Sequence, residues 1–591
     1  ENARWLYYNQ SENVLGNYYN AWDAAFNGND MTGDISNWQY NNTFQNAIAS
    51  AFIRFDLEKD FHVKFPLQSS TQVSYDYRKN KYTEFDNYGI TLPLNPPFNF
   101  SATATQAIAN DYVEPFITFG YLVNQKFDFS DWAGVTAGFR SDYSSAFGAG
   151  SKPATFPHAD GYLTFSGMPF WKGGLENAIP YFKVRGAYGE AGIQPGAFDR
   201  YPVINTGNLG NGLTYSIAGT AKNPNLKVEV SKETEFGGDL TVNLNKNGSI
   251  FKSATLSATY WQRKSENVIY PLGAAPSTGV SNVLNNSIDM SSKGWQFNLQ
   301  IPIVQSRNFN WDFTTLYGTQ RSRIDHIAGD AEIPLGSAAG STSLVLKGGR
   351  DIGQIYAFQT FRDFNKTQPD GTPYIDPAKV GQYQMVYNPY FRGMLVVDTV
   401  TRGIMFTNVQ APIGNATPKF MMSFINGLSW KNFISFNFQF DWIAGAHMYN
   451  QTKEWMFRDG ISGEFTRPVD FGEHGGFNAY TAHWASAYYG LWGSTRGIGN
   501  NTTKDFFWED ASFVRLRNIS LGFDFTRYLN IRAVKKLQLV LSGRNIATWT
   551  KYSGFDPEIS SGAVNSSYDR GIDHSTLPNT KSYQVSLNLG F

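Results

Sequence analysis

The sequence predicts an all-β fold, an antiparallel transmembrane β-barrel, and three observations carry this prediction. Apolar and polar residues alternate in long segments, the connections between segments alternate between short and long, and the composition disfavours helices. Aromatic residues make up 16% of the 591 residues and charged residues only 17%, whereas ordinary globular domains carry about 25% charged residues. The mean hydropathy is −0.36, and no apolar run approaches the roughly 18 residues that a helical span needs. Only strands could therefore cross a membrane.

The strictest alternation occupies the last ten residues, Ser582 to Phe591, in which every second side chain is apolar. The same pattern appears in 253–260, 295–301, 434–442 and 519–525. Strands in soluble sheets are usually about 5 or 6 residues long, whereas a tilted membrane crossing needs about 9 to 11. One strand departs from the pattern, because Val514 and Leu516 are out of phase with Ile519 and Leu521. A β-bulge between the two pairs would restore the phase.

The connections give an independent argument for a barrel. From Asp111 onwards the predicted short connections are 125–131, 168–180, 245–252, 302–309, 428–431 and 527–535. The predicted long connections are 141–159, 190–231, 264–292, 320–418, 444–510 and 546–580. Outer-membrane barrels have short periplasmic turns and long extracellular loops. The final strand is therefore expected to run inward and to place the C-terminus in the periplasm.

The strand count predicts that residues 1–591 form one part of a larger barrel. About 15 strands are expected, including two near 45–57 and 61–77, whereas bacterial single-chain barrels have an even number. An open edge would leave unpaired backbone groups in hydrocarbon, at a cost of several kcal/mol each. We therefore expect that at least one strand is missing and that residue 1 is not the native start.

Several function classes are disfavoured by the composition. The 49 basic and 49 acidic residues cancel, so no net field favours a nucleic-acid partner. The chain has no cysteine, which excludes thiolate metal sites and disulfides. The seven histidines show no metal-like spacing, and no Gly-x-Ser-x-Gly elbow is present. The sequence thus predicts no catalytic residue, no metal and no cofactor, and a plain turn rather than a calcium loop at 370–376.

The candidate substrate-binding residues are aromatic and fall in the longest predicted loops. Within 13 positions lie His483 and the five rings that we take as candidates, Tyr480, Trp484, Tyr488, Tyr489 and Trp492. Such rings stack on sugars or peptides, but they equally pack a long loop together or contact a partner. Both interpretations stay open. A second aromatic group, expected in an N-terminal extracellular loop, consists of Trp5, Tyr7, Tyr8, Tyr18, Tyr19, Trp22 and Trp38.

Specific sequence strings resemble one family. The clearest are 510–523 (DASFVRLRNISLGF), 542–546 (SGRNI) and 552–558 (YSGFDPE). Others, in matching order, are 140–148, 184–192, 223–229 and 414–420. Together they resemble the SusC-type (RagA-like) TonB-dependent outer-membrane transporters over roughly residues 136 to 591. Leu163 departs from the pattern, because a tryptophan is usual there.

The resemblance implies a function that the residues alone do not reveal. The complete protein would be a 22-stranded barrel filled by an N-terminal plug, and nothing similar to a plug or TonB box precedes residue 136. It would import a large nutrient, a glycan or an oligopeptide, with energy from TonB and a SusD-like lipoprotein lid. Two such pairs would form a dimer, embedded in outer-membrane lipid. The alternatives are a secretion pore, a barrel enzyme or a secreted glycan-binding β protein.

Overall fold

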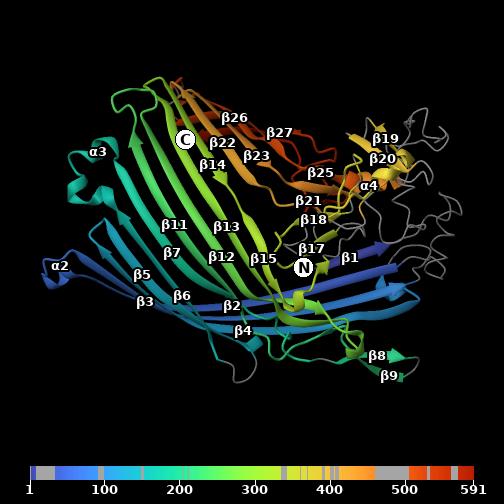
Figure 1. Cartoon of the computed structure of the whole chain (residues 1–591). Helices are drawn as coiled ribbons and strands as arrows, with labels where there is room; N and C mark the ends of the chain where they lie inside the picture. Colours follow the sequence, from blue (N-terminus) through green and yellow to red (C-terminus); the bar gives the residue numbers. More distant parts are fainter. Residues whose placement is uncertain are drawn as a thin grey trace.

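The structure is a computed structural model dominated by one large antiparallel sheet (Figure 1). It describes residues 2–7, 34–90, 99–147, 152–202, 204–209, 212–334, 343–357, 359, 361, 363–368, 370–388, 393–398, 405, 407, 411–458, 505–528, 533–560 and 570–591. No helix in this part of the chain is both long and apolar enough to cross a membrane.

Fifteen long strands make up most of the main sheet, and each pairs antiparallel with the next. In chain order they are β2 (Asp34–Asp56), β3 (Leu67–Ile90), β4 (Thr105–Phe129), β5 (Ala133–Ser144), β6 (Ala154–Thr164), β7 (Tyr181–Ile193), β11 (Glu229–Asn243), β12 (Ser253–Gly273), β13 (Asn282–Gln305), β14 (Phe309–Gly318), β22 (Phe420–Trp430), β23 (Ile434–Ala444), β26 (Phe513–Asp524), β27 (Lys536–Thr550) and β29 (Ser582–Gly590). Three shorter strands join the same sheet, namely β1 (Asn2–Tyr7), β10 (Thr220–Ala221) and β15 (Arg321–Ile327). The predicted all-β class and strand number are confirmed.

Several predicted boundaries are wrong because the strands are longer than their apolar segments. The strands predicted at 45–57 and 61–77 are β2 and β3, which extend to Asp34 and Ile90. The predicted loop 264–292 is mostly strand, since β12 continues to Gly273 and β13 begins at Asn282. Backbone pairing continues there although apolar residues such as Val268 and Ile269 do not alternate strictly with polar ones.

The expected N-terminal aromatic loop is also partly strand. Trp5 and Tyr7 belong to β1, and Trp38 belongs to β2, with which β1 pairs. The remaining aromatic residues of that group lie outside the described residues. The sequence pattern missed β1 and the outer part of β2 because apolar and polar residues do not alternate strictly there.

Smaller elements lie in the connections. The helices are α2 (Leu57–Phe61), α3 (Leu175–Ala178) and α4 (Gln451–Arg458). The 3-10 turns are Phe100–Ala102, Ser145–Phe147, Phe165–Gly167, Pro169–Trp171, Pro276–Thr278, Ala328–Asp330, Pro377–Gln382, Asp505–Phe507 and Thr526–Tyr528. The small sheets contain β8 (Ile204–Leu209) and β9 (Gly212–Ile217); β16 (Ile333–Pro334), β17 (Ser343–Leu346), β18 (Gln354–Ala357) and β21 (Ala411–Asn415); β19 (Tyr383–Asn388) and β20 (Gly393–Asp398); and β24 (His447–Asn450), β25 (Trp508–Asp510) and β28 (Ile572–Asp573).

The two ends of the main sheet differ strongly. Figure 1 places α2 and α3, which belong to short connections, at one end, and β19, β20, β25 and α4 at the other. The tightest turns, 130–132, 306–308 and 431–433, connect neighbouring strands directly. The longest connections, 319–419 and 445–512, carry most strands of the small sheets. We call the end with α2 and α3 the short-turn end, and the end with β19, β20, β25 and α4 the loop end.

The two faces of the sheet also differ. On β29 the side chains of Tyr583, Val585, Leu587 and Leu589 share one face and are 51 to 76% exposed. A soluble domain of this size would bury such a row, because large exposed apolar patches are rare on soluble monomers. The opposite, polar face carries ion pairs such as Arg140 with Asp76 and Asp142. The apolar face therefore has the character of a lipid-facing surface.

The predicted bulge is present in β26. Leu516 pairs with Phe440 and Asn518 pairs with Gln439, so Arg517 is the extra residue. The register with β27 shifts at the same place. As a result Arg515 and Asn518 both lie on the polar face, while Leu516 and Ile519 lie on the apolar face.

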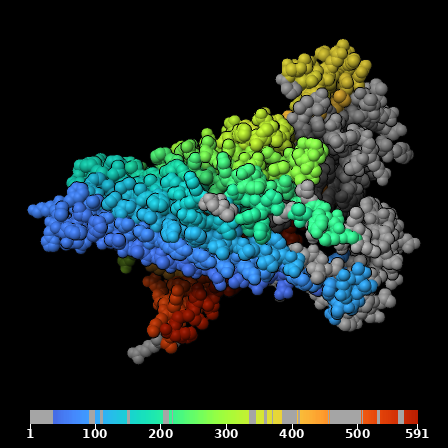
Figure 2. Space-filling model, turned by 90° about the horizontal axis from the view of Figure 1, so that it is seen from below, coloured from blue at the N-terminus to red at the C-terminus, as the bar shows by residue number. Residues whose placement is uncertain are grey.

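At one margin of the sheet β1 covers only Asp34–Gln39 of β2, and neither of these strands pairs with β29 at the other margin in the described part of the chain. The strands therefore form a curved, open sheet (Figure 1). Figure 2 shows the N-terminal strands in blue to cyan as one elongated surface, with the C-terminal strands in red at the other margin.

Candidate functional site

The five aromatic residues proposed from sequence to contact substrate lie outside the described residues. Tyr480, Trp484, Tyr488, Tyr489 and Trp492 all fall within 459–504. Their role stays a prediction. The structure instead shows how the loops on either side of this segment are attached to the sheet.

Two long connections meet at the loop end through a small sheet. Strand β24 follows β23, pairs antiparallel with β25 before β26, and pairs parallel with β28 in the connection between β27 and β29. Met448, Ala511 and Tyr552 form a buried apolar cluster beneath it. The described parts of the connections 445–512 and 551–581 therefore form one unit.

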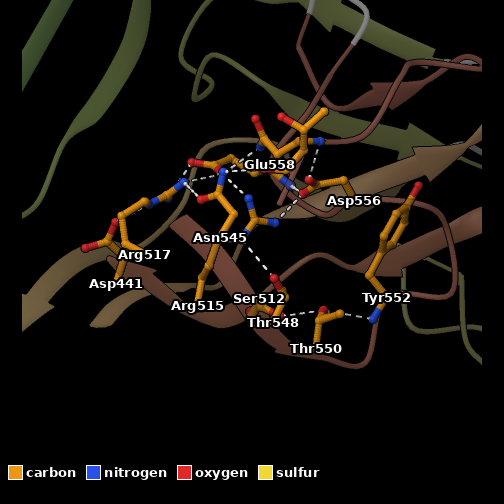
Figure 3. A network of polar contacts seen from close by, with 12 residues as sticks. Asp441, Ser512, Arg515, Arg517, Asn545, Thr548, Thr550, Tyr552, Asp556 and Glu558 are labelled. Carbon is orange, nitrogen blue, oxygen red and sulfur yellow. Dashed lines mark hydrogen bonds and ion pairs between the residues drawn. The ribbon is translucent and has the colours of Figure 1, made fainter. Parts of the chain in front are cut away.

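Arg515 attaches this unit to the polar face of the sheet (Figure 3). Its side chain is only 2% exposed. Nη2 donates to Asp556 Oδ1 and Nη1 donates to Glu558 Oε2, both at 2.5 Å. Nε donates to Thr548 Oγ1 at 2.9 Å. A strand residue thus holds two carboxylates from the loop that follows β27.

The bulge residue Arg517 adds a second attachment to the same loop. Its Nη1 and Nη2 donate to the two oxygens of Glu558 at 2.9 and 2.7 Å, a bidentate geometry. Its Nε donates to Asp441 Oδ2 on β23 at 2.7 Å. Arg517 reaches both partners because the bulge redirects its side chain. We call Asp441, Arg515, Arg517, Asp556 and Glu558 the arginine anchor.

The returning limb of the loop binds the same carboxylates. The backbone N–H of Asn579 donates to Asp556 Oδ2, and its Nδ2 donates to Glu558 Oε2, both at 3.0 Å. Both limbs of the connection are therefore fixed at one point just before β29 begins.

A second set of contacts links the two connections. Glu509 accepts from the N–H and the hydroxyl of Ser553 at 2.7 and 2.6 Å. Asp573 accepts from Tyr552 at 2.8 Å and from Thr452 at 2.9 Å. The contacts of Glu509 with Ser553 and of Thr452 with Asp573 join residues 44 and 121 positions apart, so they order loops whose local sequence does not fix them.

Burial and charge shift the pKa values of two loop residues. Burial raises the pKa of Asp556, but the hydrogen bonds from Arg515 and from two backbone N–H groups outweigh it, so the pKa lies below its ordinary value of 3.8. Burial, together with the neighbouring Asp573 carboxylate, raises the pKa of the Tyr552 hydroxyl. At neutral pH the acid is charged and the phenol is a donor.

A family model described as TonB dependent receptor-like, beta-barrel, matches residues 1–546. The chain belongs to the TonB-dependent receptor family. Among curated relatives from Formosa agariphila, TonB-dependent receptor P3 is 26% identical over 479 residues, covering 76% of this chain and 43% of the relative. TonB-dependent receptor P39 is 24% identical over 605 residues, covering 95% of this chain and 54% of the relative. The chain spans about half the length of these relatives.

Solved structures show the same fold. The RagAB peptide importer in its closed-closed state matches with a TM-score of 0.69 and 16% identity, over 95% of this chain and 57% of the other. The open-open state of the same importer matches with a TM-score of 0.66 and 17% identity, over 95% and 56%. The predicted resemblance to RagA-like TonB-dependent barrels is confirmed, and the polar face corresponds to the interior of such a barrel. Membership in this receptor family also confirms the outer-membrane location.

The arrangement is suited to holding loops rather than to catalysis. Within the arginine anchor, each carboxylate accepts hydrogen bonds from at least one guanidinium group. The histidines and acids of the described residues form no group of three or more that could hold a metal ion. The Asp370 turn is closed by Thr372, as expected of a plain turn. TonB-dependent receptors transport ligands without covalent chemistry, in agreement with the prediction that the protein is not an enzyme.

Sequence reasoning did not find the arginine anchor as a site. The strings 510–523 and 552–558 contain four of its five members, but they were treated as family markers. A signal was present, because Arg515 and Arg517 stood at positions of apolar parity and Asp556 and Glu558 repeat at the same two-residue spacing.

Proposed function

We propose that this chain forms the wall and the extracellular rim of a TonB-dependent importer of a large nutrient, an oligosaccharide or an oligopeptide. The observation that carries the proposal is the family match over residues 1–546. The fold likeness to the RagAB peptide importer supports it. A SusD-like surface lipoprotein acts as the lid, and TonB supplies the energy.

Orientation follows from the difference between the two ends of the sheet. The short-turn end faces the periplasm, and the loop end faces outward, as in other outer-membrane barrels. The C-terminal Phe591 then lies on the periplasmic side. Residues 1–591 belong to one barrel, which further strands and a plug complete. Two importer and lid pairs form a dimer.

The arginine anchor sets the position of the rim in this proposal. It fixes the connection between β27 and β29 against the inner wall, and β24, β25 and β28 fix its neighbour. The predicted aromatic residues at 480–492 lie between the fixed points 458 and 505 of that neighbour. In the proposed importer these aromatic residues contact substrate or the lid.

Uptake by intact cells tests the proposal. A strain without the gene, and the same strain carrying the full-length gene, receive labelled oligopeptides or oligosaccharides in separate assays. We expect uptake of one class only in the complemented strain, and we expect a proton-gradient uncoupler or deletion of the lipoprotein to abolish it. Uptake that persists with the uncoupler would refute TonB-dependent import, and uptake that persists without the lipoprotein would refute the lid.

A further inference from the structure

The apolar face of β12 and β13 changes its chemistry abruptly towards the loop end. Leu256 and Leu299 pair on this face, and Tyr260 pairs with Trp295 four residues further along each strand. The next pair on the same face is Gln262 with Lys293. The surface therefore passes from aliphatic to aromatic to cationic within about six residues.

The aromatic step has the composition of a membrane interface. Tyr260 and Trp295 have ring centroids 4.9 Å apart, and Trp295 stacks on Phe297 at 5.6 Å. Trp295 is 47% exposed on this outer surface. Tyrosine and tryptophan gather where hydrocarbon meets the lipid headgroups, and outer-membrane barrels carry such girdles.

A cluster of cations follows directly beyond the aromatic step. We call the side chains of Lys232, Lys264, Lys293, Arg321 and Arg323 the outer basic cluster. They come from β11, β12, β13 and β15, and they line a hollow of about 480 Å³. Strand register places all five on the apolar face, which is turned away from the arginine anchor.

The outer basic cluster has five cations against three nearby carboxylates, namely Glu266 and Asp351, which are ion-paired to it, and Asp325, which lines the same hollow. Glu266 pairs with Lys232 at 2.7 Å and with Lys264 at 3.0 Å. Arg321 pairs with Asp351 at 3.0 Å. Lys293 and Arg323 form no ion pair with any described residue. These two cations remain available to an anion from outside the protein.

Depth also fits lipid headgroups. Lys293 lies two residues and Lys264 four residues beyond the aromatic pair, which is about 7 and 13 Å along a strand. Headgroups occupy the outer part of a bilayer, about 5 to 8 Å beyond the hydrocarbon on each side, and the strand tilt shortens the distance along the membrane normal. A second hollow of about 740 Å³ shares Lys293 and Arg321 and is also lined by Tyr260 and Trp295. The cationic and aromatic surfaces are therefore continuous.

We propose that the outer basic cluster binds the phosphate groups of an anionic membrane lipid, whose hydrocarbon lies against Tyr260, Trp295 and Phe297. The proposal rests on the membrane placement given under the proposed function. Basic pockets at the membrane border bind anionic headgroups. An acidic protein could bind the cations, but it would not cover the adjoining aromatic surface, which faces lipid. Because the cationic and aromatic surfaces are continuous, one lipid molecule fits both better than a protein does.

The test uses full-length protein purified in detergent, with native mass spectrometry as the readout. Three ligands are added in separate experiments: a diphosphorylated lipid A, the same lipid without its phosphates, and inorganic phosphate. The variant Lys293→Gln/Arg323→Gln removes only the two cations without a carboxylate partner. Its matched control is Lys79→Gln/Lys81→Gln, because Lys79 and Lys81 lie on the same face of β3 and form no ion pair with a described residue.

We expect wild type and the control to retain the diphosphorylated lipid, and the Lys293/Arg323 variant to bind it at least about tenfold more weakly. All proteins should show the same folded mobility on gels. Equal retention of the lipid without phosphates, displacement by inorganic phosphate, or unchanged binding by the variant would overturn the proposal. If the Lys293/Arg323 variant kept the lipid but lost binding to the lipoprotein, the lipid proposal would be overturned in favour of a protein partner. Nutrient uptake is measured separately, so a failed lipid site does not count against import.

Discussion

Arg515 is the residue on which the attachment of the last loop depends. It is buried with Asp556, which is 6% exposed, and it also holds Glu558. Replacing Arg515 by methionine keeps much of its volume but leaves the buried carboxylate of Asp556 without its cationic partner. Removing one member of a buried ion pair costs about 3 to 5 kcal/mol. We expect faster hydrogen exchange in peptides covering 552–558 and 579 of the Arg515→Met variant.

The matched control is Arg544→Met on the neighbouring strand β27. Arg544 also lies on the polar face, opposite Asn518, but it forms no ion pair with any described residue. Exchange in the same peptides should stay at the wild-type rate. Equal acceleration in both variants would show that the loop responds to any lost arginine, and the anchor would then have no special role.

Acid should release the same loop. The pKa of Asp556 is lower in the folded protein than its ordinary value of 3.8, so its contribution to stability is fully present above that value. It is lost as the pH falls through the lower, folded pKa. We expect protection of residues 552–558 from hydrogen exchange to be constant from pH 8 to about 5 and to fall below pH 3.8. In Asp556→Asn this acid-dependent step should shrink, and an unchanged step would contradict its assignment to Asp556.

The arginine anchor also shows what sequence alone could not supply. The out-of-phase residues around Arg517 predicted a bulge because parity is a local property of one strand. The partners of Arg515 lie 41 and 43 positions away. Their meeting depends on the connection after β27 folding back onto the wall, which no local pattern encodes.

At the scale of elements, the bulge in β26 controls which face each side chain takes. Deleting Arg517 would force either Phe513–Leu516 or the rest of the strand onto the opposite face. Arg517→Ala removes the contacts with Asp441 and Glu558 but keeps the residue count. We expect the deletion to abolish folding and the alanine variant to fold, as read from heat-modifiable mobility on gels. A folded deletion protein would mean that the neighbouring register shift in β27 absorbs the change.

Element boundaries were predicted well only where one face of a strand is apolar. The segments around β23, β26 and β29 have such a face, and their strands were placed within a few residues. In the outer parts of β2, β12 and β13 apolar and polar residues do not alternate strictly, so the sequence pattern gave no signal there. Their strand structure comes from cross-strand backbone hydrogen bonds.

At the scale of the whole molecule, the exposed apolar face predicts how the protein behaves outside a membrane. Rows such as Tyr583 to Leu589 would be exposed to water in buffer. We expect the full-length protein to remain with the outer-membrane fraction after lysis and after washing with high salt, and to dissolve only in detergent. Recovery in the buffer fraction would contradict the lipid-facing assignment of this surface.

Strands β2, β3 and β4 are 23, 24 and 25 residues long, whereas a tilted crossing uses about 9 to 11. More than half of each strand therefore lies outside the hydrocarbon layer. In that part, water competes for every backbone hydrogen bond. Local opening costs least where a ribbon is solvated and lightly packed. We therefore expect the free energy of local opening to fall along each of these strands, from the part in the bilayer to the outer end, so that this side of the mouth can deform although its secondary structure is continuous.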